Sequence, residues 1–338
     1  MNIQQIYELG VRMGIETDLR GRKSVLKNLK RKKDKYERLS PKAKKRFDKE
    51  ALVNPYSDTR IFVDPKREVK KVLAGIDIGP AEILVAKELG VDLVIAHHPV
   101  GSALADLGDV MHLQAEVLAG YGVPINIAES LTKERISEVA RGMSPINHYR
   151  GVDTAELFKI GLMCIHTPTD NMVASFLDAH LKKAKPEFVG DVVDALEEIP
   201  EYQKAIEQKT GPKVFVGHRD NFVGKLVLTE ITGGTEGAVG IYEKMAQAGI
   251  GTIVGMHMAE DRKKEAQKNH VNVVISGHMS SDSLGMNIFL DELERKGIEV
   301  IPCSGLIRVS RIKKRSSAKK KSKPMAKTKT KVKAKKKK

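Results

Sequence analysis

The stretch Val91–Pro99 limits the possible folds of this chain more than any other part, because an apolar run there ends on two adjacent histidines. The four residues Leu93–Ala96 are all apolar and lie between a glycine and a proline, which is typical of a fully buried strand. Ligands of an open α/β sheet gather outside the carboxyl ends of its strands. We therefore interpret His97 and His98 as the edge of a metal site; the alternative is that they merely end a strand.

The residues before this stretch favour a parallel βαβ unit. A strand is predicted over 70–77, and Gly79-Pro80 begins a predicted helix whose apolar residues recur at helical spacing up to Leu89. Strand, helix and strand follow one another within about 30 residues, as in an α/β protein with a parallel sheet. We predict the α/β class on this basis.

Periodicity and turn residues predict most of the remaining elements. Helices are predicted over 2–14, 111–119, 133–143 and 287–293, and strands over 60–63, 123–128, 162–165, 214–216, 225–229, 252–254, 271–277 and 299–302, the last at the edge of a sheet. Residues 176–212 are predicted to be helices and a variable linker. Gly233–Gly237 matches neither common phosphate-binding motif and favours a tight turn between a strand and a helix.

Two further predicted strands also end on side chains that bind metals. One is followed by His166 and Asp170, and we expect a helix to begin there with Asp170 as its N-cap. Another is followed directly by a predicted helix on which His278 and Asp282 lie one turn apart on the same face. A histidine and a carboxylate at this spacing can reach one ion, whereas capping alone would explain Asp170 without a metal.

Together the strand ends supply three imidazoles and two carboxylates, from His97, His98, Asp170, His278 and Asp282. One ion needs about four ligands, and mixed nitrogen and oxygen ligands suit Zn, Fe, Mn, Co or Ni. Five protein ligands with one bridging carboxylate would hold two ions. Such a pair activates water and stabilises an oxyanion.

The formal charge of +16 is concentrated in two segments. Arg311–Lys338 holds 16 basic residues and no acidic ones, and we expect this Lys-rich tail to be disordered. The segment 20–49 holds 15 basic residues against three acidic ones and is predicted to form two helices, the second capped by Ser40 and beginning at Pro41. Its default interpretation is a solvated charged hairpin, and the alternative is binding to RNA or DNA phosphates.

The sequence gives no sign of a membrane or secretory protein. It has no apolar run of about 18 residues, and its start lacks a basic region followed by an apolar one. Its two cysteines, Cys164 and Cys303, cannot form a disulfide framework and suit a reducing compartment. We therefore expect a cytoplasmic protein without a membrane span.

Three motifs give the chain a specific resemblance. Asp-Leu-x-Ile-x-His-His-Pro over Asp92–Pro99, His-Thr-x-x-Asp over His166–Asp170 and Gly-His-x-x-Ser-Asp over Gly277–Asp282 resemble, in this order, the motifs of the Nif-three-like family of dinuclear metal proteins. This family is also known as homologues of GTP cyclohydrolase I type 2. The resemblance runs from about Asn54 to Ser310 and is weakest over 176–212.

The resemblance implies two α/β lobes of the Nif-three-like fold that face each other across a metal cleft. It implies metal ligands, and the matching positions are His97, His98, Asp170, His278 and Asp282. It also implies a homo-oligomer, commonly a ring-like hexamer.

Two positions depart from the family pattern. Asp282 stands where the family usually has Glu, so its shorter side chain either draws the backbone closer or binds one ion only. His257 stands where the family often has a Gly-Glu pair, and it is a candidate added ligand or proton carrier. We consider His257 and His166 as candidate catalytic proton shuttles, because imidazole titrates near neutral pH. The alternative for His257 is a surface histidine at a strand end.

From these observations we expect five parts. A basic helical extension over 1–50 precedes a first lobe over 51–175, which holds two of the motifs. A variable linker over 176–212 leads to a second lobe over 213–310 with the third motif, and a polybasic tail follows over 311–338. The expected function is that of a hydrolase with two divalent ions, acting on a phosphoester or in the manner of GTP cyclohydrolase. The alternative is a non-catalytic metal-binding scaffold or regulator. In either case the tail segment Lys313–Lys338 would bind nucleic acid non-specifically.

Overall fold

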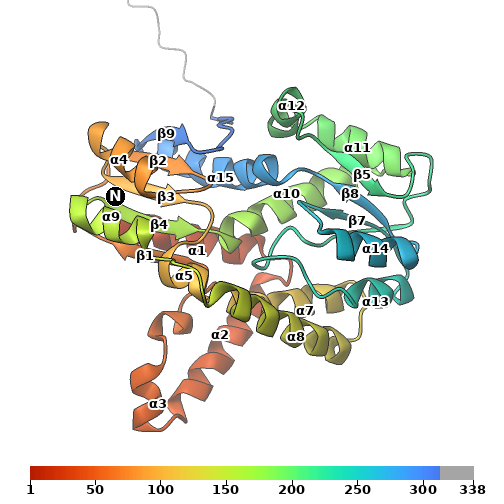
Figure 1. The fold of residues 1–338 in the computed structure, drawn as a ribbon, viewed down its shortest axis with the longest axis horizontal. Coiled ribbons are helices and arrows are strands. Elements are labelled where there is room, and N and C mark those ends of the chain that lie inside the picture. The colour runs from red at the N-terminus through yellow and green to blue at the C-terminus, as the bar shows by residue number, and fades with distance from the viewer. Residues whose placement is uncertain (313–338) are drawn as a thin grey trace, which may run out of the picture.

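The computed structural model of this chain describes residues 1–312 and contains two separate sheets (Figure 1). The first lobe is built on a five-stranded sheet in the order β1 (Thr59–Val63), β4 (Gly161–Ile165), β3 (Leu93–Ala96), β2 (Lys71–Gly75) and β9 (Glu299–Cys303). The second lobe is built on a four-stranded sheet in the order β5 (Lys213–Val216), β8 (Asn272–Ile275), β7 (Ile250–Gly255) and β6 (Lys225–Leu228).

Parallel pairing dominates both sheets. The pairs β2–β3, β3–β4 and β2–β9 of the first sheet are parallel, as are β6–β7 and β7–β8 of the second. Helix α4 (Pro80–Glu88) connects β2 to β3, which confirms the predicted βαβ unit. The strand over 299–302 is also confirmed at a sheet edge, since β9 pairs only with β2 among the strands of the first sheet.

Helices cover the sheets and connect them. Besides α4 they are α1 (Ile3–Thr17), α2 (Arg22–Glu37), α3 (Pro41–Arg46), η1 (Lys49–Leu52), α5 (Gly101–Ala105), α6 (Leu107–Val110), α7 (His112–Gly120), α8 (Ile125–Met143), α9 (Arg150–Phe158), α10 (Thr167–Ala184), α11 (Val189–Glu197), α12 (Pro200–Glu207), α13 (Ile241–Gln247), α14 (Glu260–Lys268) and α15 (His278–Arg295). Two of them, α10 and α15, lie between the two sheets in Figure 1. Helix α10 follows a strand of the first lobe and α15 follows a strand of the second.

Helices α10 and α15 approach each other unusually closely where the first turn of α10 meets the third turn of α15. A Cβ atom added at Gly285 of α15 would lie 2.3 Å from the backbone oxygen of Thr169 in α10. Only glycine permits this approach, because any side chain there would overlap the neighbouring backbone. The contact fixes the beginning of α10 against α15 at a point two turns after His278.

The core is aliphatic, as a chain with 4% aromatic residues requires. All four residues of β3 are completely buried, which confirms the prediction of a fully buried strand. On one side of this sheet Ile95 packs in a cluster with Ile165 and with Phe289 of α15. Burying such side chains contributes about 1.5–3 kcal/mol each, so the strand ends that carry His97 and His166 are firmly held.

The predicted strand over 123–128 is wrong, because α8 begins at Ile125, directly after Pro124. The residues alternate in polarity over this short stretch, but a longer helical pattern continues beyond it and buries Ala128, Thr132 and Val139. Nineteen residues of helix therefore outweigh six residues of apparent strand.

Two other local predictions also need correction. Asp170 is not the N-cap of its helix, since α10 begins at Thr167 and Asp170 lies within the first turn. Pro168 explains the earlier start, because proline is favoured in the first turn of a helix. The residues 229–240 between β6 and α13 form a long loop rather than a tight turn.

The basic segment forms the predicted pair of helices and stands away from the body in Figure 1. Ser40 caps α3 by accepting a hydrogen bond from the backbone nitrogen of Ala43 at 3.3 Å, and Pro41 is the first helical residue. Within residues 1–312, none of the helices is long and apolar enough to span a bilayer. The predicted disorder of the Lys-rich tail concerns residues almost entirely outside the described part.

Candidate metal centre

The five predicted metal ligands lie together between the two lobes. His97 and His98 follow β3 of the first lobe, and Asp170 lies in the first turn of α10 after β4. His278 and Asp282 lie at the beginning of α15, after β8 of the second lobe. The helix predicted to begin just after Gly277 is confirmed, so this histidine and this aspartate are one turn apart on one face.

The two carboxylate oxygens of Asp282 lie close to the Nε2 atoms of different histidines. Its Oδ1 lies 3.4 Å from Nε2 of His97, and its Oδ2 lies 3.4 Å from Nε2 of His98 and 3.5 Å from Nε2 of His278. Nε2 of His97 is also 3.4 Å from Oδ1 of Asp170. Ligand atoms bonded tetrahedrally at about 2.0–2.1 Å from an ion are about 3.3–3.4 Å apart, so these separations fit metal coordination.

The cluster contains three groups of side chains whose ligand atoms all lie within 4.8 Å of one another. The groups are His98–His278–Asp282, His97–Asp170–Asp282 and His97–His98–His166. Asp282 is common to the first two groups, as His98 is to the first and third and His97 to the second and third. The shorter aspartate therefore reaches ligand atoms on both sides of the cluster in spite of lacking the methylene of a glutamate.

Several buried atoms of the cluster have no hydrogen-bond partner among the described residues. They are Nε2 of His97, Oδ1 of Asp170 and both carboxylate oxygens of Asp282. A buried polar atom without a partner costs about 1–3 kcal/mol, and buried polar groups are usually satisfied. These four atoms point toward one another, so a divalent cation between them fits the donor set that the chain presents.

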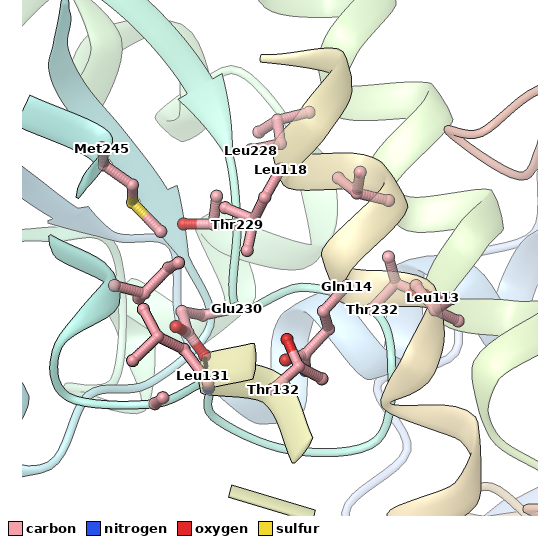
Figure 2. Close-up of a pocket in the computed structure, with 14 residues that line it drawn as sticks. Leu113, Gln114, Leu118, Leu131, Thr132, Leu228, Thr229, Glu230, Thr232 and Met245 are labelled. Carbon is pink, nitrogen blue, oxygen red and sulfur yellow. Dashed lines mark hydrogen bonds between the residues drawn. The ribbon is translucent and has the colours of Figure 1, made fainter. Parts of the chain in front are cut away.

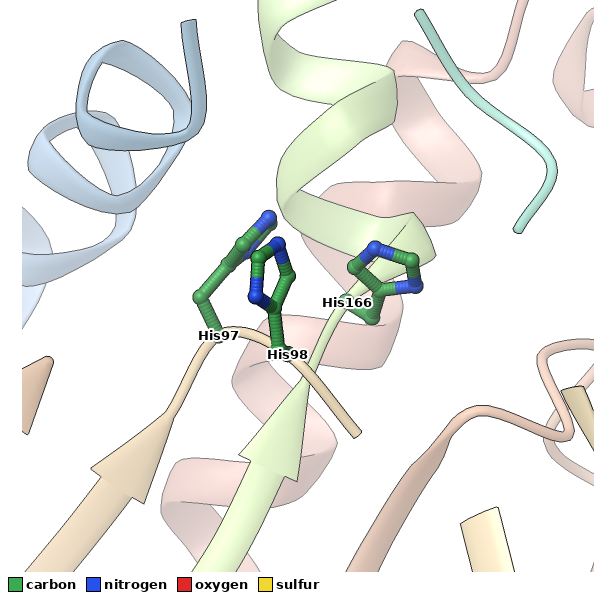
Figure 3. Close-up of side chains that lie close together, drawn as sticks. All are labelled: His97, His98 and His166. Carbon is green, nitrogen blue, oxygen red and sulfur yellow. The ribbon is translucent and has the colours of Figure 1, made fainter. Parts of the chain in front are cut away.

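Each of three histidine rings is held by a partner outside the cluster, so that its Nε2 faces inward. Figure 3 shows His97, His98 and His166 close together at the ends of two neighbouring strands. Their Nδ1 atoms lie 3.0 Å from Thr169 Oγ1, 2.7 Å from Asp77 Oδ1 and 2.8 Å from Asp58 Oδ2, respectively. Such outer partners fix the orientation of metal-binding imidazoles.

Sequence reasoning missed the two carboxylates among these partners. Asp77 follows β2 just as His97 follows the neighbouring β3, so the rule that identified the histidines could have found it. Asp58 precedes β1 and comes next to His166 only because β1 pairs antiparallel with β4, Thr59 opposite Ile165. No local pattern predicts that pairing.

The two candidate proton shuttles occupy different positions. His166 is buried inside the cluster, with Nε2 3.6 Å from Oδ2 of Asp170. His257 lies at the rim, where its ring centroid is 4.7 Å from that of His278 and its Nδ1 is 3.2 Å from Oε1 of Glu236. Both line a cleft of about 290 Å³ together with three of the predicted ligands.

The electrostatics of the cluster favour a bound cation. Burial, together with the nearby carboxylate of Asp282, raises the pKa of Asp170 to about 8. Burial opposes charge on Asp282 as well, but contacts with His97 and His98 outweigh it and lower the pKa of Asp282. Burial likewise opposes charge on His98, yet the close carboxylates of Asp282 and Asp77 outweigh it and raise the pKa of His98 to about 10. Positive charge is thus stabilised on His98, whereas burial lowers the pKa of His97 and that of His278, to about 4, so these two imidazoles favour the neutral form that binds metals.

A second cavity lies beside the cluster, between α7, α8 and the second sheet (Figure 2). Its walls are mainly aliphatic, with Leu118, Leu131 and Met245 among them. Glu230 and Thr232 line both this cavity and the cleft of the histidines. Burial raises the pKa of Glu230, whose backbone also has a φ of 57°, a conformation uncommon for residues other than glycine.

Comparison with known proteins finds a family match and similar solved structures. Residues 47–106 match the family described as Duf34/NIF3 (NGG1p interacting factor 3). A NIF3 superfamily protein from Sphaerobacter thermophilus is 30% identical in sequence, with a TM-score of 0.69, and the match covers 74% of this chain and 92% of that one. No curated protein sequence matches the chain.

Two more distant solved structures also resemble the fold. The protein TTHA1606 from Thermus thermophilus is 20% identical, with a TM-score of 0.44 and coverage of 76% of this chain and 92% of that one. Reduced HcgD from Methanocaldococcus jannaschii is 16% identical, with a TM-score of 0.42 and coverage of 70% of this chain and 84% of that one. The identity and coverage of the Sphaerobacter protein, together with the family match, show that this chain belongs to the NIF3 superfamily.

Proposed function

We propose that the protein binds two divalent metal ions between its lobes. His98, His278 and Asp282 would hold one ion, and His97, Asp170 and Asp282 the other, with Asp282 bridging the two. The observation that carries this proposal is the set of buried, unpartnered atoms that face one another in the cluster. The nitrogen and oxygen donors suit Zn, Fe, Mn, Co or Ni, and no single metal is favoured among these.

His166 is proposed as an additional ligand of the second ion. Its Nδ1 is held by Asp58, so only Nε2 is available, and that atom faces Asp170. The role of proton carrier then falls to His257, which is more accessible and is oriented by Glu236. A histidine that can take up and release a proton at the rim of a cleft suits general acid–base catalysis.

We propose metal-dependent hydrolysis as the reaction class, on a phosphoester or, as the resemblance to GTP cyclohydrolase homologues implies, on a purine ring. Bound divalent ions supply Lewis-acid activation and lower the pKa of a coordinated water. Within the chain, Asp58 and Asp77 orient the imidazoles, and His257 would carry the proton. The side chains of His98 and His278 are 25% and 37% exposed, which supports an ion that a substrate can reach.

The alternative is a non-catalytic metal-binding scaffold or regulator. The deep burial of His97, Asp170 and Asp282 favours it, because a closed site holds a structural ion. The two functions differ in one measurable respect. Metal removal abolishes turnover in the first case, and in the second it reduces stability or assembly while there is no turnover to lose.

The proposal is tested by elemental analysis of the purified protein together with turnover of GTP and of generic phosphoesters. His97→Ala should lose metal and activity, while His218→Ala, which removes a histidine whose side chain is 75% exposed, should keep both. Equal turnover in the two variants would contradict hydrolysis at this site. Full metal content in His97→Ala would contradict the ligand assignment.

Three further properties are proposed for the protein in its cell. We propose a cytoplasmic homo-oligomer, with a hexamer suggested by the family resemblance alone. We also propose that Lys313–Lys338, which lies outside the described residues, binds nucleic acid non-specifically through its lysines. Deletion of this segment should reduce retention on DNA at low salt.

A further inference from the structure

The folded part of the chain separates its charges strongly. Residues 1–310 hold 43 basic and 43 acidic side chains, yet the segment 20–49 alone holds 15 basic and three acidic ones. The rest of residues 1–310 therefore carries an excess of twelve acidic side chains. The segment 20–49, called the basic hairpin below, consists mainly of α2 and α3.

The basic hairpin presents its positive charge outward. Helix α2 attaches to the body through Val25 and Leu29, which are the two buried residues of the helix. On its outer side Lys27, Arg31 and Lys35 are all exposed and follow one another at intervals of four residues. This spacing places them in a row, with about 6 Å between successive side chains.

Little within the described part of the chain neutralises this row. Among the basic residues of α2 and α3, ion pairs within residues 1–312 join Lys32 to Asp109 and Lys44 to Glu37. Like charges four residues apart on a helix repel each other and cost about 0.2–0.5 kcal/mol per pair. The hairpin thus keeps an unfavourable arrangement that a polyanion would relieve.

The aromatic residues of the hairpin serve its own packing. Tyr36 of α2 and Phe47 lie 5.0 Å apart between ring centroids, and Lys44 covers the ring of Tyr36. They are engaged within the hairpin and therefore unsuited to stack on bases. A surface of cations without available aromatic side chains has no stacking platform for bases, and its lysines contact mainly the phosphate backbone.

We propose that the basic hairpin is a docking surface for nucleic acid, which it binds through the phosphate backbone independently of sequence. The surface is separate from the metal centre and from the tail. A nucleic acid is favoured over an anionic membrane because α2 presents no apolar face to solvent: Val25 and Leu29 are buried, and Leu26, 40% exposed, is a single apolar side chain. Helices that lie on membranes insert a whole apolar face. The positive charge of the basic hairpin complements a nucleic acid, which carries one negative charge per nucleotide.

The test uses the full chain and two variants that lose the same charge. The first is Lys27→Gln/Arg31→Gln/Lys35→Gln, in the outer row of α2. The matched control is a triple Lys→Gln variant at exposed positions on or next to other helices, which are Lys87, Lys133 and Lys296. The affinity of each protein for a 25-base-pair DNA duplex and for a 25-nucleotide single-stranded RNA is measured by fluorescence anisotropy at several salt concentrations. Circular dichroism and metal content verify that both variants fold.

The hairpin variant should bind more weakly than the control, and the slope of log K against log salt should fall by about 2 to 3, since each phosphate contact contributes roughly 0.7 to 0.9. Comparison of the two probes shows whether duplex or single strand is preferred. The tail is present in every protein, so its contribution cancels. The proposal is overturned if the two variants bind alike. It is also overturned if the hairpin variant loses binding to phosphatidylserine vesicles but not to nucleic acid.

Discussion

Metal removal should destabilise the protein by an amount that follows from the geometry of the cluster. Four buried atoms lack hydrogen-bond partners there, on His97, Asp170 and Asp282. Each unpartnered atom costs about 1–3 kcal/mol, so the metal-free cluster is expected to cost about 4–12 kcal/mol relative to the loaded one. Domains typically unfold with about 5–15 kcal/mol, so this cost is comparable to the whole stability.

The corresponding change in melting temperature is large. For a chain of this size 1 kcal/mol shifts the midpoint by about 2 °C, so chelation should lower it by roughly 8 to 24 °C. Calorimetry of the protein before chelation, after chelation and after return of zinc or manganese measures the effect, and elemental analysis confirms each state. The reasoning is refuted if the metal-free protein melts at the same temperature as the loaded one.

Three other outcomes are expected. By elemental analysis, Asp282→Asn should lose both ions, whereas Asp170→Asn should keep one; equal losses would contradict a bridging role for Asp282. The raised pKa of Asp170, about 8, means that the folded metal-free protein holds a proton that the unfolded chain releases above about pH 4, so its stability should fall as pH rises from about 4 to 8. Denaturant unfolding should show this fall in the wild type and not in Asp170→Asn. Gly285→Ala should cost about 1–3 kcal/mol and weaken metal binding, because its Cβ would overlap Thr169, while Gly120→Ala, with open space around it, should change the melting temperature little.

The local patterns predicted the strand ends that carry the site. The run before His97 and His98 is buried as its composition required, and α15 begins at His278 as the preceding glycine indicated. These predictions succeeded because a buried strand and the beginning of a helix are determined mainly by residues close in sequence. That the three strand ends meet is a tertiary property, and the family resemblance supplied it.

The wrong and the missing predictions concern features that depend on residues far away in the sequence. The residues over 123–128 alternate like a strand, but the helix that contains most of them is also stabilised by burial of Thr132 and Val139 further along the chain. Asp58 contacts His166 across 108 positions of sequence, through a pairing of β1 with β4 that no nearby residue announces. Sequence reasoning therefore predicted the candidate ligands and missed most of the residues that hold them in place.

The close crossing of α10 and α15 has a consequence for biosynthesis. His97, His98 and Asp170 leave the ribosome before their counterparts His278 and Asp282, because they precede them in the chain. A nascent chain therefore cannot assemble the complete cluster until both halves have emerged and docked. Acquisition of the full set of ions would then mark a chain that has been synthesised at least through α15, and products truncated before that helix would be left without it.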